Sequence, residues 1–161
     1  MDAQIPWEVR RRILEASVRA PQDWHESAVR SAYASGDDAS KLTAVFCMRF
    51  VCGFDEQIVA ELDCRNPGIH LEAVLAAGNW GIEAAWPHIA ALILSGKTPK
   101  PLLLVAIEAV PGVRPQEASE ILTGFAESND EDIVEAVHEA LASCEDEQED
   151  DDEEEGDFFL E

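Results

Sequence analysis

The sequence predicts an all-α protein built from stacked helix pairs, and three observations lead to this prediction. Apolar residues recur at helical spacing along most of the chain, and no stretch alternates as a half-buried strand would. Turn signals separate these segments every ten to fifteen residues or so. Helix-starting residues recur at positions 66, 98 and 130, a fixed spacing of 32 residues.

Four helices are expected between residues 6 and 62. Pro6 suits a first helical turn, where its missing N–H costs no hydrogen bond, and Pro21 ends that helix. The second helix passes through Trp24 to Ser35, and Asp37 or Asp38 caps a third that ends at Gly53. A short fourth helix lies at 58–62. The apolar side of the first helix is expected to hold Val9, Ile13, Ala16 and Ala20, with Leu14 and Val18 beside them.

Four more helices are expected between residues 66 and 125. Asn66 and Pro67 give an N-cap followed by proline, and Thr98 and Pro99 repeat this start. Between them an apolar stripe predicts a helix over 82–93. The segment 102–110 is apolar nearly all round and is expected to be the most buried helix. The remaining boundaries are a turn at Pro111-Gly112 and a helix from Pro115 to Phe125.

The last helix is expected to begin at a capping box formed by Ser128 and Glu131 and to end near Ser143. Residues 145–161 contain twelve acidic side chains and no basic one. Because these charges repel one another in any compact form, the segment is expected to be a disordered acidic tail.

The three helix starts at 66, 98 and 130 define an internal repeat. In that alignment Ala73, Val105 and Val137 coincide, and residues 37–62 form a weaker earlier copy. A fixed period of roughly 20–50 residues is typical of solenoids, in which one helix pair cannot bury its apolar face alone.

Three segments of the chain resemble HEAT repeats, the paired-helix units of α-solenoids. Residues 73–81 resemble the end of a first helix with its turn, 83–92 a second helix with a proline in its first turn, and 130–141 an acidic turn with the next first helix. The resemblance covers roughly 37–144, and 6–35 is interpreted as a divergent first pair. One feature departs from the family: His70, Leu102 and Val134 stand where an arginine is typical.

The resemblance implies an α-α superhelix of about four HEAT-like helix pairs plus a C-terminal capping helix. The predicted domains are a helical repeat domain at 1–144 and the acidic disordered tail at 145–161. Repeat stacking is expected to rely on apolar packing, because the missing arginine removes the usual polar ladder between repeats.

The net charge of -23 restricts the expected partners. Phosphate backbones and anionic lipids are repelled at long range, so nucleic acid and membranes are not expected to bind, and a protein with a basic surface is. No apolar run reaches the roughly 18 residues of a membrane helix, and the first residues lack the features of a signal peptide. The predicted location is therefore the cytoplasm, where the four cysteines stay reduced.

No motif in the sequence indicates catalysis, a cofactor or a metal. The four histidines and four cysteines show none of the spacings typical of metal ligands, and no Gly-rich phosphate loop or nucleophile motif occurs. The sequence therefore predicts a protein that is not an enzyme, with no cofactor.

The predicted function is that of a protein-binding scaffold or adaptor, as the HEAT resemblance implies. The second helix of each pair lines the concave side in that family. An alternative is an acidic charge mimic that inhibits a basic, nucleic-acid-binding protein. The expected contact residues are Trp24, Glu56, Trp80, Glu83, His88, Glu117, Glu120, Phe158, Phe159 and Leu160.

Two of these sites are open to a second interpretation. Trp80 is either folded over a repeat edge or a recognition anchor. The Phe158–Leu160 segment is interpreted as a short motif that docks in a groove, here or on another chain. The acidic tail is also expected to reach the basic run Arg10-Arg11-Arg12 and Arg19 of its own molecule.

Overall fold

The computed structural model describes the backbone of residues 5–152 and the side chains of residues 5–145, and this part of the chain is all-helical with no strand. The predicted all-α class is therefore confirmed. The elements are α1 (Trp7–Ser17), α2 (Asp23–Ala34), α3 (Asp38–Met48), α4 (Asp55–Glu61), α5 (Pro67–Trp80), the 3-10 helix η1 (Glu83–Ala85), α6 (Trp86–Leu94), α7 (Lys100–Val113), α8 (Pro115–Leu122), the 3-10 helix η2 (Thr123–Phe125) and α9 (Glu131–Asp152).

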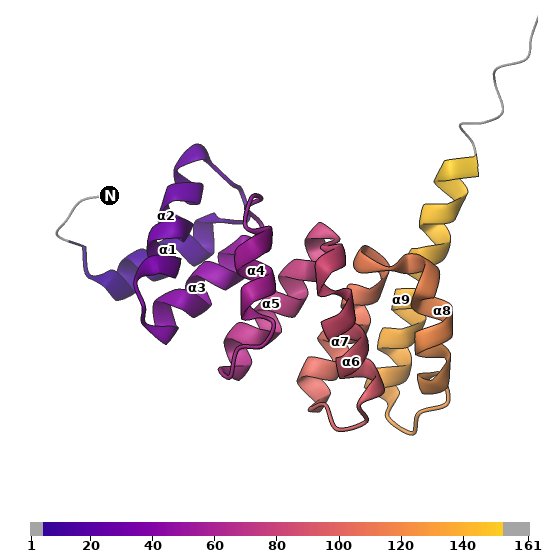
Figure 1. The fold of residues 1–161 in the computed structure, drawn as a ribbon. Helices are drawn as coiled ribbons and strands as arrows, with labels where there is room; N and C mark the ends of the chain where they lie inside the picture. Colours follow the sequence, from indigo (N-terminus) through magenta and orange to yellow (C-terminus); the bar gives the residue numbers. More distant parts are fainter. Residues whose placement is uncertain (1–4, 153–161) are drawn as a thin grey trace, which may run out of the picture.

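The helices pack in the order in which they occur along the chain. The odd-numbered helices form a row in which α3 contacts α1 and α5, and α7 contacts α5 and α9. Each even-numbered helix packs on the odd helix that follows it. Figure 1 shows α1 at one end of the molecule and α9 at the other. One apolar core runs through these contacts, from Leu14 on α1 to Cys144 on α9.

Helices α5 and α7 cross in close backbone contact. A Cβ atom placed on Gly78 would lie 2.8 Å from the Cα atom of Ala109, and one placed on Gly112 would collide with the carbonyl oxygen of Gly78. Glycine permits this approach because no side chain separates the two backbones. The crossing joins the two halves of the row at its centre.

Most of the predicted helix starts are confirmed. Asp37 accepts a hydrogen bond from the Ser40 N–H at 2.8 Å, and Asn66 accepts two from the first turn of α5. At α9 the capping oxygen belongs to Asp130, which accepts from the Asp132 N–H at 3.1 Å. A capping box between Ser128 and Glu131 is not formed.

The predicted cap at Thr98 is wrong. Its hydroxyl donates to the Leu92 carbonyl oxygen at 2.5 Å, and α7 begins two residues later at Lys100. Thr98 therefore closes the end of α6, because the last carbonyl groups of a helix lack partners within it.

Two predicted turns lie inside helices. Trp80 is the last residue of α5, and Gly81, with a left-handed backbone (φ 60°), ends that helix. Pro111 and Gly112 belong to α7, where Pro111 is buried. Packing against α5 therefore outweighs the local turn preference of Pro-Gly. The break comes at Arg114, whose position before Pro115 disfavours helical backbone.

α9 is longer than predicted. It continues to Asp152 rather than ending near Ser143, so the first part of the expected tail is helical. Glu and Gln are good helix formers, and no glycine or proline interrupts the sequence between Ser128 and Gly156. The remainder of the predicted disordered tail, 153–161, lies outside the described residues.

The first helix buries a different face from the one expected. Leu14 and Val18 are buried against the core, whereas Val9 and Ile13 are 46% and 40% exposed. The reason is that α1 is the first helix of the row. Among the described helices, α3 is the one with which it makes extensive contact. Its outer side therefore has no covering helix among the described residues.

Candidate protein-binding groove

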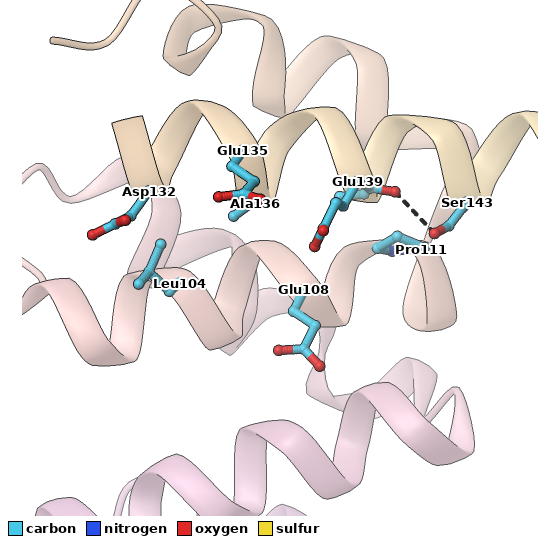
Figure 2. A pocket seen from close by; sticks show the side chains of 9 residues that line it. Leu104, Glu108, Pro111, Asp132, Glu135, Ala136, Glu139 and Ser143 are labelled. Carbon is cyan, nitrogen blue, oxygen red and sulfur yellow. Dashed lines mark hydrogen bonds between the residues drawn. The ribbon is translucent and has the colours of Figure 1, made fainter. Parts of the chain in front are cut away.

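A groove lies between α7 and α9 on the described surface. It has a volume of about 350 Å³ and is lined from both helices. Figure 2 shows Glu135 and Glu139 projecting from α9 into the space beside α7. The lining residues are Leu104, Glu108, Pro111, Asp132, Glu135, Ala136, Glu139, Ala140 and Ser143.

The spacing of these residues along each helix explains why they share one groove. On α9 the acidic residues Asp132, Glu135 and Glu139 follow one another at i, i+3 and i+7. Residues at these positions lie along one face of a helix. Ala136 and Ala140 occupy the neighbouring line, and their small side chains leave room above α7.

The groove combines an apolar floor with an acidic rim. Ala140 and Pro111 are buried, and Leu104 is half-buried. The four carboxylates of Glu108, Asp132, Glu135 and Glu139 are exposed, and none of the lining residues is basic. The rim is therefore negative where the floor is apolar.

One lysine partly neutralises the end of the groove. Lys100 Nζ lies 2.5 Å from Asp132 Oδ2 and 2.9 Å from Asp130 Oδ1. Its hydrogen bonds to Asp132 and Asp130 raise the pKa of Lys100, and the hydrogen bond from Lys100 lowers the pKa of Asp130. Glu135 and Glu139 have no ion pair in the described part of the chain, so they stay available to a cationic ligand.

Such a groove suits one kind of ligand. Carboxylates accept charge-assisted hydrogen bonds from the N–H groups of lysine and arginine. An apolar floor between two helices accepts leucine-sized side chains from an amphipathic helix. The geometry therefore fits a peptide segment that carries both apolar and basic residues.

The structure brings two of the predicted contact residues, Glu83 and Glu117, together. They meet in an ion-pair network within the chain. Glu83 lies 2.6 Å from Arg114, and Glu117 lies 2.9 Å from the same guanidinium. Their charges are satisfied within the chain, which links η1 to the start of α8. Glu120, on the same helix as Glu117, is exposed.

His88 belongs to a histidine pair. Its Nε2 lies 2.8 Å from Nε2 of His70, so one ring donates and the other accepts. Its Nδ1 lies 3.4 Å from a carboxylate oxygen of Asp63. Burial, and then the neighbouring His88, lower the pKa of His70. The pair joins α5 to α6.

The remaining predicted residues lie at separate places on the surface. Trp80 donates from Nε1 to the Met48 carbonyl oxygen at 2.7 Å, which ties the end of α5 to the end of α3. Glu56 is exposed and lies with Trp80 around one open hollow. Trp24 lies at the far end, stacked on His25 with ring centroids 3.8 Å apart. Phe158, Phe159 and Leu160 lie outside the described residues.

Sequence reasoning missed the groove, although a signal for it was present. Asp132, Glu135 and Glu139 share a helix face in the sequence, but so do many acidic residues of this chain. The expectation that second helices supply the contacts pointed to α4, α6 and α8 instead. The groove is formed by α7 and α9, both first helices in the expected pairing.

The described part of the chain contains histidine, cysteine and many acidic side chains. No group of three or more histidine, cysteine or acidic side chains in it is arranged to hold a metal ion. Cys47 and Cys144 are both buried, and burial raises the pKa of the Cys47 thiol to about 12. No described helix is both long enough and apolar enough to cross a membrane.

Comparison with models of protein families, with curated proteins and with solved structures found no match to this chain.

Proposed function

We propose that this chain is a HEAT-like solenoid scaffold that binds a basic amphipathic segment of another protein in the groove between α7 and α9. The observation that carries the proposal is the groove itself, an apolar floor of Leu104, Pro111 and Ala140 under a rim of four carboxylates.

The order of helix contacts supports the solenoid part of the proposal. In a solenoid each repeat contacts its neighbours, and the odd helices of this chain contact one another in sequence. Polar links between helix starts support it as well. Asn66 donates to Asp38 at 3.1 Å, and Lys100 bonds to Asp130 across a separation of 30 residues. These links take the place of the arginine ladder typical of the family.

The charge of the molecule supports a basic partner. A net charge of -23 attracts cationic surfaces and repels nucleic acid and anionic membranes. Electrostatic attraction of this kind sets the rate and selectivity of encounter, while the apolar floor supplies packing that salt does not screen. In this proposal the protein acts in the cytoplasm as an adaptor without catalytic activity of its own.

Binding of a defined peptide tests the proposal. The probe is an amphipathic peptide of about 18 residues with leucines at helical spacing and lysines elsewhere. The control peptide has the same composition in an order that forms no apolar face. The amphipathic peptide should bind more tightly, and part of its affinity should persist at high salt, where the Debye length is about 3 Å.

Charge reversal localises the binding site. The double variant Glu135→Lys, Glu139→Lys should weaken binding by roughly tenfold or more, because two attractive contacts become repulsive. The matched control Glu120→Lys, Glu127→Lys makes the same change in net charge at exposed positions outside the groove. Equal weakening by both double variants would contradict a specific role for the groove.

A charge mimic is the second candidate, and the composition of α9 favours it. Its 22 residues include eleven acidic ones over roughly 33 Å at 1.5 Å per residue, about one charge every 3 Å. One DNA strand carries a phosphate about every 3.4 Å. If the two peptides bind equally and both lose affinity as salt rises, mimicry is the better explanation.

A further inference from the structure

A second groove lies at the opposite end of the molecule, between α1 and α2. Both helices pack on α3 but make few contacts with each other, so the space between them stays open. It has a volume of about 280 Å³. Trp7 and Leu14 line it from α1, and Trp24 and Ala28 line it from α2.

This groove is shaped for aromatic or large aliphatic side chains. Leu14 forms its floor at 2% exposure, while Trp7 and Trp24 form its walls at 42% and 40% exposure. A cavity of roughly 150 Å³ with apolar walls is enough to hold a benzene ring. Exposed tryptophans beside an apolar floor are typical of binding hot spots.

Arg10 is the one charged side chain among the residues that line this groove. Four of the eleven basic residues of the chain lie within 10–19, although the net charge is -23. Arg10 lines the groove, and Arg12 and Arg19 are exposed with no ion pair in the part of the chain that the structure describes. The groove is thus an aromatic site with one arginine in its lining.

We infer that the α1–α2 groove binds the Phe158–Phe159–Leu160 segment of a second copy of this chain. That segment supplies two aromatic rings and a leucine, and the run 149–157 before it supplies eight acidic side chains. Phenylalanine rings stack favourably against tryptophan, and carboxylates pair with arginine. The segment therefore complements the groove in both shape and charge.

The length of the row of helices favours a groove on a second copy over the groove of the same molecule. Helix α9 ends at Asp152, and Phe158 follows six residues later, a reach of at most about 20 Å. The row from α9 to α1 contains four helix-to-helix steps of roughly 8–10 Å each, about 32–40 Å in all. Figure 1 also shows α1 and α9 at opposite ends. A groove on a second copy does not require the segment to span this row of helices, and docking of the tail on its own molecule stays a prediction.

The proposed contact is head-to-tail, with the aromatic groove of one copy against the acidic C-terminal segment of the next. Contacts of this kind are heterologous, so they extend into chains or close into rings. Repulsion between the other parts of two acidic molecules is screened beyond about 8 Å at physiological salt.

Sedimentation velocity of the full chain over a range of protein concentrations tests the inference. The wild-type protein should associate as its concentration rises, and high salt should weaken the association. Trp24→Ala in the groove and Phe158→Ser with Phe159→Ser in the tail should each raise the dissociation constant by roughly tenfold or more, as loss of an aromatic hot spot does. The control Leu94→Ala removes an apolar side chain that is 70% exposed elsewhere and should change nothing.

Mixing the variants gives a result that only a head-to-tail contact predicts. The groove variant still has an intact tail, and the tail variant an intact groove, so their mixture should form a dimer that goes no further. Circular dichroism melts of each variant check that it is folded. A wild-type protein that stays monomeric, association that survives both variants, or a mixture that stays monomeric would each overturn the inference.

A peptide corresponding to 150–161, titrated into the tail variant and followed by tryptophan fluorescence, tests the same contact separately. The wild-type peptide should change the fluorescence, and a peptide with Phe158→Ser and Phe159→Ser should not. Equal signals from both peptides would mean that charge alone drives binding and would overturn the proposed role of the aromatic groove. Charge reversal in the α7–α9 groove should not affect this titration, which separates it from the proposed adaptor function.

Discussion

Replacing Gly112 with alanine tests the close crossing of α5 and α7. The added Cβ would collide with the carbonyl oxygen of Gly78, which is backbone and cannot rotate away as a side chain can. The two helices would have to separate, and their separation would disturb the surrounding contacts of Ala77 and Val110, which are both fully buried.

Two opposing terms set the size of the effect. Alanine favours a helix interior over glycine by about 1 kcal/mol. Overpacking a tight contact costs about 1–3 kcal/mol, and a rigid backbone partner places this site at the upper end. The net loss is about 1–2 kcal/mol. For a chain of this length each kcal/mol lowers Tm by about 2–4 °C, so Tm should fall by about 2–8 °C.

Thermal melts followed by far-UV circular dichroism, which reports the helix content, measure this change. Gly124→Ala is the matched control, because a Cβ there meets nothing within 4 Å and the backbone is not left-handed. The control should melt at or slightly above the wild-type temperature. If Gly112→Ala melts as high as the wild type, Gly112 does not lie against the Gly78 backbone.

Three further predictions concern separate features of the chain. Stability should fall as the pH drops below 6.5, because the pKa of His70 is lowered in the folded chain and the unfolded chain therefore binds more protons at those pH values. His70→Gln should flatten the dependence of Tm on pH, and an unchanged slope would exclude the His70–His88 pair as its cause. Asn66→Ala should lower the free energy of unfolding by about 1 kcal/mol in urea titrations, since its side chain caps two N–H groups of α5; no change would show that the cap is not needed. Under native conditions a maleimide should modify the exposed Cys52 and spare the buried Cys47, whose pKa is raised to about 12. Equal labelling of the two cysteines in peptide mass spectrometry would contradict the burial of Cys47.

The positions of the helices could largely be predicted from the sequence, because the signals that start and end a helix are local. Asp37 and Asn66 cap helices where expected, since a side-chain oxygen needs only the next three residues to do so. The exceptions arose where packing outweighed a local preference. Pro111 and Gly112 form a turn by local preference, but contact with α5 keeps them helical.

The candidate sites were much less predictable. Glu83 and Glu117 looked like free contact residues in the sequence, yet Arg114 pairs with both of them. Glu135 and Glu139 looked like an ordinary solvated face, and only the position of α7 beside them makes that face one wall of a groove. The charge of a residue can be read from the sequence, but its partner depends on which helices meet.

The sequence by itself therefore determined the all-α class, most of the helix starts and the acidic run at the C-terminal end. The tertiary structure decided which faces are covered, where α7 and α9 leave a groove, and that α1 and α2 separate around Trp7 and Trp24. The physical reason is range. Capping and helical periodicity act within a few residues, whereas a groove requires two helices whose mutual position is set by packing across the whole core.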